Sequence, residues 1–289
     1  MRVLVTGGSG FLGGSVIPQL IGAGHQPTAL VRSTVAATRV TDLGATAVHG
    51  DLDDPASVDA AFASSGGEAL VNLASLGFGH APTIVAAAEE AGLTRAVFVS
   101  TTSIFTRFAT ASKPVRIAAE ETVRSSALDW TIIRPTMIYG TPSDRNMARL
   151  LKALRRLPVL PLPDGGRALQ QPVHVDDLAT AIVTALDRPV SIYKAYDVAG
   201  PQALTFRRVV EESGRAVDRP PRLVSVPLAP MVGLVRVYQA LAPSPRLKSE
   251  QVARLAEDKA VDIEAARADL DFRPRTFAEG IGAEAAMLL

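Results

Sequence analysis

The sequence predicts an α/β fold, with a doubly wound parallel sheet flanked by helices on both faces. Three observations support this prediction. Short apolar, β-branched runs alternate with alanine-rich amphipathic stretches through the first two-thirds of the chain. The apolar runs are continuous, which is typical of parallel strands buried on both faces. A glycine-rich turn directly follows the first run, where a strand would meet its crossover helix.

The first two-thirds of the chain predict six strands and four helices. The strands are residues 3–5, 28–31, 45–49, 69–73, 96–100 and 130–134. The helices lie near residues 13–22, 55–63, 81–91 and 115–125. Each helix falls between two strands, as in the crossover connections of a parallel sheet.

After Tyr139 the pattern is less regular. Residues 157–166 are rich in Pro and Gly and predict a loop, whereas residues 171–175 and 196–199 are extended. Asp176 is placed to cap a helix that ends near Leu186. We therefore expect a sheet domain of residues 1–140 and 171–200. The remaining residues, 141–170 and 201–289, are expected to form a small, mainly helical substrate lobe.

The composition of the 289 residues limits the classes of function. With 47% hydrophobic and 20% charged residues the chain resembles an ordinary globular protein, and its formal net charge of +1 favours neither nucleic acid nor an anionic membrane. The absence of cysteine excludes disulfides and thiolate chemistry. His25, His49 and His80 lack metal-ligand spacing, so no metal is expected.

No apolar run approaches the roughly 18 residues that a membrane span requires. The first expected strand begins at residue 3, with no basic and apolar leader before it. These two features predict a cytoplasmic protein without an integral membrane segment. The helices that flank the sheet are compatible with a homodimer.

Residues 6–13 read Thr-Gly-Gly-Ser-Gly-Phe-Leu-Gly between an expected strand and an expected helix. Two registers are open, Gly7-Gly10-Gly13 or Gly8-Gly10-Gly13. In either register one glycine makes a tight turn, one allows a pyrophosphate to approach, and Gly13 allows close packing of helix and strand. The amino terminus of the helix would then face the phosphates. This pattern predicts a Rossmann-type dinucleotide site that includes Thr6, Gly7, Ser9, Gly10, Phe11, Leu12 and Gly13.

The end of the second expected strand bears on the choice between NAD and NADP. An NAD site usually carries an Asp or Glu about 20 residues after the glycine loop, to bind the ribose 2′-hydroxyl. Here the segment 29–33 reads Ala-Leu-Val-Arg-Ser. Arg32 could pair with a 2′-phosphate, and its alternative role is that of a solvated surface residue. The sequence therefore favours NADP(H) over NAD(H).

Later turns resemble those of one superfamily. Gly50-Asp51-Leu52 looks like an acidic turn whose Asp and following residue hold the adenine, and Asn72-Leu73-Ala74-Ser75 resembles the "HLAA" turn. Residues 133–140 resemble "RPxxVYG", whose proline, here Pro135, would lie near the nicotinamide. Residues 173–179 and 269–280 resemble the segments "VHVDDVA" and "LGFxP…EG".

With the loop at residues 6–13, which is similar to TGxxGxxG, these six motifs occur in order along nearly the whole chain. The chain resembles the short-chain dehydrogenase/reductase superfamily, in its extended and atypical branches (NAD-dependent epimerase/dehydratase-like and NmrA-like). The resemblance implies cofactor contacts from Asp51, Leu52, Leu73, Ala74, Ser75 and Pro135.

The chain departs from the superfamily at its catalytic signature, YxxxK. Ser112 stands at the Tyr position and Arg116 at the Lys position, while Thr102 matches the catalytic Ser/Thr. An unperturbed Ser hydroxyl has a pKa far above the range useful for acid–base catalysis. Arg116 can polarise an oxygen or hold a ribose hydroxyl, although it cannot release a proton at neutral pH. Hydride transfer survives this change if solvent supplies the proton.

These features predict an NADPH-dependent reductase of a small organic carbonyl or conjugated substrate, with Thr102, Ser112 and Arg116 facing that substrate. The missing Tyr keeps a second interpretation open, namely a non-catalytic NADP(H) sensor or an accessory subunit. A sugar epimerase or dehydratase fits less well. We interpret His174 as structural. The apolar stretch 228–241 is expected to pack in the core of the small lobe, with a substrate pocket or a membrane surface as alternatives.

Overall fold

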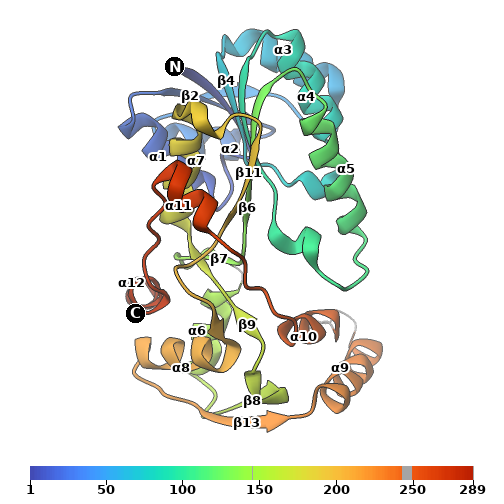
Figure 1. Ribbon diagram of the computed structural model, residues 1–289, viewed down its shortest axis with the longest axis vertical. Helices are drawn as coiled ribbons and strands as arrows, with labels where there is room; N and C mark the ends of the chain where they lie inside the picture. The colour runs from blue at the N-terminus through green and yellow to red at the C-terminus, as the bar shows by residue number, and fades with distance from the viewer. Residues whose placement is uncertain (145, 243–248, 289) are drawn as a thin grey trace. The chain divides into compact units, whose positions relative to one another are not determined.

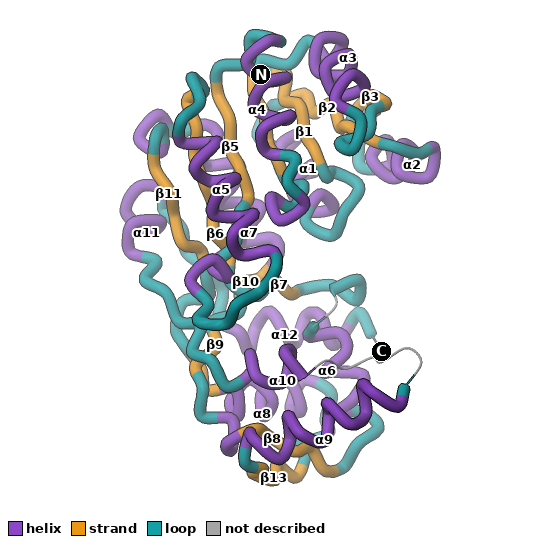
Figure 2. The backbone as a smooth tube through the Cα atoms, turned by 90° about the vertical axis from the view of Figure 1, so that its right-hand side faces the viewer, coloured by secondary structure: helices purple, strands orange, loops and turns teal. Residues whose placement is uncertain are grey.

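The computed structural model describes residues 1–144, 146–242 and 249–288. The chain divides into two compact units (Figures 1 and 2). Unit 1 comprises Met1–Thr136, Val175–Val198 and Asp262–Arg273. Unit 2 comprises Met137–His174, Ala199–Val261 and Pro274–Leu289.

Unit 1 contains a seven-stranded sheet in the order β11-β6-β5-β4-β1-β2-β3, and all its neighbouring strands are parallel. This order confirms the doubly wound α/β class. The strands are β1 (Arg2–Thr6), β2 (Gln26–Val31), β3 (Thr46–His49), β4 (Ala69–Asn72), β5 (Arg95–Val99), β6 (Asp129–Pro135) and β11 (Lys194–Val198).

Helices cover both faces of this sheet. One face carries α3 (Pro55–Ser65), α4 (Ala81–Glu90) and α5 (Ser112–Arg124); the other carries α1 (Gly13–Gly22), α7 (Val175–Asp187) and α11 (Glu264–Leu270), as Figure 1 shows. Two short 3₁₀ helices, η1 (Leu76–Phe78) and η2 (Thr102–Phe105), follow β4 and β5. Strands β4 and β5 are buried along their whole length, which explains their continuous apolar sequences.

The helix α2 (Thr34–Asp42) was not predicted from the sequence. Its residues include three Thr and two Val, which are weak helix formers, and Val40 is its buried residue. The helix forms because Ser33 caps it by accepting a hydrogen bond from the Ala36 N–H at 3.2 Å. Helix α5 also begins earlier than predicted, since Pro114 is tolerated in a first turn.

Helix α7 begins at Val175, so the prediction that Asp176 caps it from outside is wrong. Asp176 lies within the first turn, and its carboxylate accepts a hydrogen bond from the Ser15 hydroxyl at 2.7 Å. This bond joins α7 to α1 on the same face of the sheet. The sequence could not show it, because the two residues are 161 positions apart.

The described part of unit 2 contains three two-stranded pairs instead of one sheet: β10 with β7, β12 with β9, and β13 with β8. These strands are β7 (Ile138–Tyr139), β8 (Val159–Pro163), β9 (Leu169–Gln170), β10 (Val173–His174), β12 (Leu204–Thr205) and β13 (Arg222–Val226). The helices are α6 (Met147–Leu154), α8 (Phe206–Ala216), α9 (Leu228–Leu241), α10 (Ser249–Leu255) and α12 (Phe277–Ala286). Apolar residues of α6, α8 and α12 form its core.

The prediction of a loop at residues 157–166 is wrong, because β8 pairs in parallel with β13. The Arg222 N–H donates to the Pro158 carbonyl at 2.9 Å. Since backbone groups alternate in direction along a strand, Pro161 and Pro163 face away from β13. A proline on the unpaired side of an edge strand leaves no ladder hydrogen bond unmade.

The expectation that residues 228–241 pack in the core is also wrong. They form α9, and of its fourteen residues, all of them described, Val235 alone is buried.

Candidate functional site

Strands β1 and β4 meet at the centre of the unit 1 sheet, where the chain order reverses. In open α/β sheets, ligands bind beyond the carboxyl ends of the strands at such a point. The Thr6 hydroxyl donates to the Asn72 side-chain oxygen at 2.5 Å, and the Leu73 N–H donates to the Thr6 carbonyl at 2.9 Å. These contacts hold the ends of the two strands in register.

In the loop after β1, Gly7 and Gly13 lie so close to other backbone atoms that no side chain would fit at either position. Gly7 has a φ of +70°, and a Cβ there would lie 2.7 Å from the Ala74 nitrogen. A Cβ on Gly13 would lie only 1.9 Å from the Gly8 carbonyl oxygen. The Gly10 N–H donates to the Gly7 carbonyl at 3.0 Å and closes the turn. This geometry favours the Gly7-Gly10-Gly13 register.

Helix α1 starts at Gly13 with no side-chain cap among the described residues, since its N-cap is Leu12. The Gly14 and Ser15 N–H groups donate to the Gly10 and Leu12 carbonyls at 3.3 Å and 3.1 Å, and the helix dipole favours negative charge at this end of α1. The tight turn that Gly7 and Gly13 permit and the uncapped helix end therefore fit a pyrophosphate. Of the other predicted residues of this loop, Phe11 is half-buried, and Ser9 lies in the turn between Gly7 and Gly13.

Two Arg residues follow β2, one directly after the strand and one on α2. Arg32 is exposed immediately after the strand. The Arg39 Nη1, on α2, donates to the Ser9 carbonyl of the glycine loop at 3.3 Å. Arg39 was not among the predicted site residues, because its approach to the loop depends on the unpredicted helix α2. The signal in the sequence is a second Arg seven residues after Arg32, within residues 29–39, which contain no Asp or Glu.

The turns after β3 and β4 are held by their own polar side chains. The Asp51 carboxylate accepts from the Asp53 N–H at 3.1 Å, and the Asp51 N–H donates to the Ser57 hydroxyl at 3.0 Å. Leu52 packs against the core cluster of unit 1. Ser75 caps η1 by accepting from the Gly77 N–H at 3.2 Å. The predicted adenine-side residues therefore lie in rigid turns at the carboxyl edge of the sheet.

Arg116 links the first turn of α5 to the end of β5. Its Nη1 donates to the Ser112 hydroxyl at 2.8 Å and to the Ser103 hydroxyl at 3.2 Å. Ser112 and Arg116 share one face of α5 because they are four residues apart. A Cβ on Gly77 would lie 3.0 Å from the Arg116 Nε, so the guanidinium also lies close against η1.

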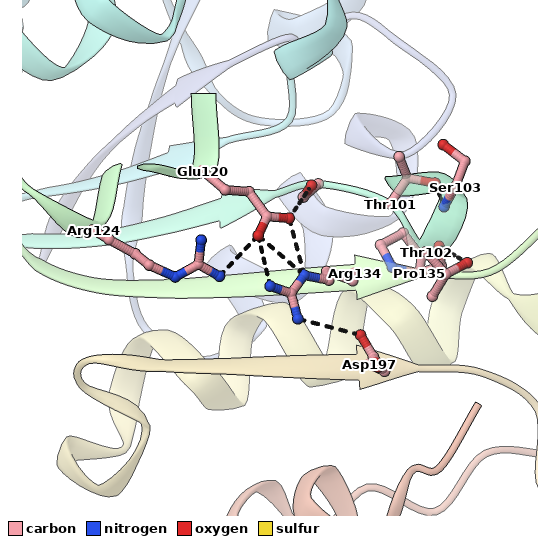
Figure 3. A network of polar contacts seen from close by, with 9 residues as sticks. Thr101, Thr102, Ser103, Glu120, Arg124, Arg134, Pro135 and Asp197 are labelled. Carbon is pink, nitrogen blue, oxygen red and sulfur yellow. Dashed lines mark hydrogen bonds and ion pairs between the residues drawn. The ribbon is translucent and has the colours of Figure 1, made fainter. Parts of the chain in front are cut away.

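Thr102 and Pro135 lie together, at the ends of neighbouring strands. The Thr102 hydroxyl donates to the Pro135 carbonyl at 3.3 Å, as Figure 3 shows. The hydroxyl beside Arg116 is instead that of the following residue, Ser103, which sequence reasoning missed. Motif alignment selected Thr102, whereas the turn of η2 directs Ser103 toward α5.

A buried ion-pair network fixes α5 on the sheet (Figure 3). The Glu120 carboxylate, 2% exposed, accepts from Arg134 Nε at 2.9 Å and Nη2 at 2.6 Å, from Arg124 Nη2 at 2.9 Å, and from the Ser100 hydroxyl at 2.6 Å. Burial opposes ionisation of Glu120, yet the hydrogen bonds from Arg134 and Ser100 outweigh it and hold its pKa below the usual value. The network sets the position of α5, and so that of Ser112 and Arg116.

Asp197, on β11, extends the network at the sheet edge. Its Oδ1 lies 3.7 Å from the Arg134 Nη1. Burial raises the pKa of this carboxyl, and Arg134 offsets part of the effect. Arg134 is therefore held between two carboxylates. Its Cζ atom lies over the ring of Phe105, 5.4 Å from the centroid of that ring.

The arrangement can position an oxygen atom without supplying an activated phenol. Because Arg116 donates to both Ser112 and Ser103, their oxygens accept and their hydroxyl protons can be donated onward. Two hydroxyls oriented by a fixed cation form a small hydrogen-bond donor set of the kind that stabilises developing negative charge.

Comparison with known proteins agrees with this geometry. The NAD(P)H-binding family matches residues 7–189, which include the glycine loop and all the strand-end turns described above. The chain belongs to the NAD(P)H-binding family. This assignment confirms a nicotinamide cofactor and an oxidoreductase family.

The chain is 30% identical to a mitochondrial NADH dehydrogenase [ubiquinone] 1 alpha subcomplex subunit 9 of Arabidopsis thaliana, over 93% of this chain and 73% of that protein. It is 29% identical to a ceramide reductase of Caulobacter vibrioides, over 78% of this chain and 73% of the relative. The UDP-glucose 4-epimerase structure from Thermotoga maritima superposes with a TM-score of 0.78 at 16% identity, covering 100% of this chain and 98% of that one. This superposition confirms the Rossmann-type fold, and the family match confirms the prediction of a dinucleotide-binding protein.

His174, in unit 2, is 4% exposed, and its ring meets that of Tyr139 edge to face with centroids 5.3 Å apart. Its burial in this aromatic contact is in keeping with a structural role. Among the residues that the structure describes, none of the helices is both long and apolar enough to span a membrane.

Proposed function

We propose that the chain is an NADP(H)-dependent reductase of a small organic carbonyl or conjugated substrate. The observation that carries this proposal is the contact of Arg116 with the hydroxyls of Ser112 and Ser103. This group lies on the elements that the superfamily uses for catalysis, next to the strand ends that would hold the cofactor. The ceramide reductase relative supports a reduction as the reaction class.

The preference for NADP(H) is argued from charge at the end of β2. Arg32 and Arg39 supply two guanidinium groups there, and residues 29–39 contain no Asp or Glu to bind a ribose 2′-hydroxyl. Arg39 already contacts the glycine loop, so it can reach a phosphate bound beside that loop. Guanidinium groups pair with phosphate through two parallel hydrogen bonds.

Charge reversal tests this preference. Arg32→Asp and Arg39→Asp should each weaken NADPH binding by about 10- to 100-fold, the loss of one charge-assisted phosphate contact. NADH binding should change less than threefold, and fluorescence titration with both cofactors measures this. Arg273→Asp is the matched control, since its side chain is 84% exposed and pairs only locally with Asp271. Equal weakening of NADH and NADPH by the two variants would contradict the NADP preference.

The residues present account for reduction without a catalytic Tyr. Bound NADPH would supply a hydride to the electrophilic carbon of the substrate. The developing negative charge on the substrate oxygen would be bound by the hydroxyls of Ser112 and Ser103, which Arg116 orients. A proton from solvent completes the alcohol, so one hydride and one proton are added in total. Electrostatic stabilisation and positioning provide the rate enhancement in this scheme.

A panel of ketones, enones and quinones tests this reaction through NADPH oxidation at 340 nm. Arg116→Met should lower kcat/KM by about 10²-fold, as expected when an orienting cation at an oxyanion is lost, and leave NADPH affinity within threefold. Arg107→Met, a nearby Arg on the loop before α5, is the control and should retain full activity. Cofactor binding without turnover across the whole panel would contradict the reductase proposal.

The second candidate is a non-catalytic NADP(H)-binding sensor or accessory subunit. Two observations favour it specifically: Ser112 occupies the position of the catalytic Tyr, and one relative is a subunit of NADH dehydrogenase. This candidate predicts tight cofactor binding with no turnover, and no effect of Arg116→Met on any assay except stability. The same panel and titration therefore separate the two candidates.

A further inference from the structure

Two phenylalanine residues of unit 1 lie largely exposed at the ends of the 3₁₀ helices η1 and η2. Phe78 is 76% exposed and Phe105 is 54% exposed. Each helix already contributes another side chain to the core, since Leu76 is 3% exposed and Ile104 is 8% exposed. The two Phe rings are therefore not needed for the packing of their own turns. Because singly exposed apolar residues are common on proteins, the position of these two relative to the candidate site decides what they mean.

Both rings belong to turns that adjoin the Arg116 guanidinium. The Arg116 Nη1 donates to the Ser103 hydroxyl of η2 at 3.2 Å, and a Cβ on Gly77 of η1 would lie 3.0 Å from the Arg116 Nε. Phe78 directly follows Gly77, and Phe105 is two residues after Ser103. With about 3.8 Å between consecutive Cα atoms, the Cα of each Phe lies within roughly 8 Å of the Cα of a residue beside the guanidinium.

Neighbouring groups hold both rings in position. The Cζ of Arg134 lies over the Phe105 ring, 5.4 Å from its centroid, and Arg134 is itself paired with the buried Glu120. The rings of Phe78 and His80 meet at an interplanar angle of 48°, with their centroids 6.3 Å apart. These contacts still leave more than half of each Phe exposed. A further ring can therefore pack against them at a low cost in conformational entropy.

Hydrogen-bond donors and aromatic rings thus occur together on η1, η2 and the start of α5. The hydroxyls of Ser112 and Ser103, which Arg116 orients, suit an oxygen that accepts hydrogen bonds. We infer that the substrate is an aromatic ketone or enone, whose ring packs against Phe78 and Phe105 while its carbonyl oxygen accepts from the two Ser hydroxyls. This inference rests on the proposed function, which places the substrate oxygen at these hydroxyls.

Other occupants fit the two rings less well. An aliphatic ligand buries apolar surface, but it lacks the offset and edge-to-face contacts that aromatic rings make with one another. A second copy of the chain is disfavoured by area. Two Phe side chains bury about 150–250 Å² each, whereas a specific protein interface buries roughly 800 Å² on each partner.

Binding of two matched enones to the full chain loaded with NADP⁺ tests the inference without turnover, because the oxidised cofactor carries no hydride to transfer. The pair is benzylideneacetone and ethylideneacetone, which differ only by a phenyl group in place of a methyl group. Isothermal titration should give a Kd at least tenfold lower for benzylideneacetone. Its cyclohexyl analogue, which is apolar but not aromatic, should bind at least threefold more weakly than benzylideneacetone.

Variants assign this preference to the two rings. Phe78→Ser and Phe105→Ser should each lower the ratio of the two Kd values at least threefold, and Phe78→Leu, which stays apolar, should lower it less. Since Phe78 is largely exposed, Phe78→Ser should leave thermal unfolding unchanged, so its effect on binding is not a loss of fold. Val190→Ser is the control and should keep the wild-type ratio. Val190 is 46% exposed on another 3₁₀ helix of unit 1, η4 (Pro189–Ser191).

Three results would overturn the inference. The first is a wild-type Kd ratio below threefold, or no binding of either enone, and the second is a ratio that both Phe→Ser variants leave unchanged. The third is dimerisation of the wild type, abolished by Phe78→Ser, with no preference for benzylideneacetone; it would assign the rings to a second copy of the chain.

NADPH oxidation with the same two enones separates this inference from the proposed function. Equal kcat/KM for the two enones would keep the reductase and overturn the aromatic substrate. Selective binding of benzylideneacetone without any turnover would support the aromatic site and contradict the reductase.

Discussion

Unit 1 and unit 2 are built from strands in two different ways. In unit 1, seven parallel strands share one ladder, and the candidate site is a set of turns at their carboxyl ends. In unit 2 the described strands form separate pairs, and the elements are joined by side chains of α6, α8 and α12. A continuous ladder positions its turns through the backbone, whereas separate pairs depend on individual side-chain contacts. This difference explains why the strands and turns of unit 1 could be predicted from local sequence signals and the packing of unit 2 could not.

The largest effect on stability is expected at Glu120, the side chain that holds α5 on the sheet of unit 1. Glu120→Ala should destabilise the protein by about 3–5 kcal/mol, because it leaves the largely enclosed, 14% exposed Arg134 side chain without its main partner. The pKa of Glu120 is held below its unfolded value, so its contribution is full above about pH 4.3 and is lost as the pH falls further. Urea unfolding at pH 7 and at pH 4 measures both effects.

Glu121→Ala is the matched control for Glu120→Ala, since Glu121 is the exposed neighbour on the same helix. It should change stability by less than about 0.5 kcal/mol. If Glu120→Ala lowers the free energy of unfolding no more than Glu121→Ala does, the network does not hold α5 on the sheet.

The next effect tests the backbone-built site of unit 1. Gly13→Val should weaken cofactor binding by about 100-fold or more, because its Cβ would overlap the Gly8 carbonyl and displace the loop. Gly14→Ala is the control, since a Cβ at Gly14 meets nothing within 4 Å. Isothermal titration with NADPH compares the two variants. Retained affinity in Gly13→Val would show that the loop does not form the cofactor site.

In unit 2, a buried carboxyl is expected to give a smaller, pH-dependent effect. Glu284 is fully buried on α12, and its Oε2 accepts from the Gly140 N–H at 3.0 Å. Burial, together with the neighbouring Asp144 carboxylate, raises the pKa of Glu284 to about 9. Because the folded pKa lies above the unfolded value, its contribution is full below about pH 4.3 and decreases as the pH rises toward 9.

Glu284→Gln removes this titration while keeping the shape of the side chain. The variant should match the wild type near pH 4 and be more stable by at least about 1 kcal/mol at pH 8, since each pH unit in this window is worth about 1.4 kcal/mol at most. Thermal unfolding from pH 4 to pH 9 measures the difference. Parallel stability curves for the two proteins would contradict a neutral, buried Glu284.

The smallest effect on stability is expected in residues 262–273, the carboxy-terminal segment that belongs to unit 1. Asp269, on α11, accepts from the Lys194 Nζ at 2.7 Å and from the Tyr196 hydroxyl at 2.8 Å, both on β11. Asp269→Asn should cost about 1 kcal/mol, because the ion pair is half-exposed and one hydrogen bond is weakened. Hydrogen exchange should report faster opening of residues 262–273, with the cofactor turns unchanged. Asp271→Asn, an exposed neighbour, is the control.

The sequence by itself determined the fold class, the strands of the unit 1 sheet and the glycine loop. These features depend on local signals: continuous apolar runs, and glycines spaced for a tight turn after a strand. The motifs also predicted an NAD(P)-binding family, which the family match confirms, and the alignment with YxxxK predicts Ser112 and Arg116 at the positions of its Tyr and Lys.

The tertiary structure alone decided which side chains meet. Arg39 approaches the glycine loop only because α2 forms, and the turn of η2 brings the Ser103 hydroxyl to Arg116. Glu120 on α5 is hydrogen-bonded to Ser100, after β5, and to Arg134 on β6. Strand β8 pairs with β13 through backbone groups on the side that Pro161 and Pro163 face away from. The reason is physical: such contacts depend on the distance between residues far apart in the chain, and local propensity and periodicity carry no information about that distance.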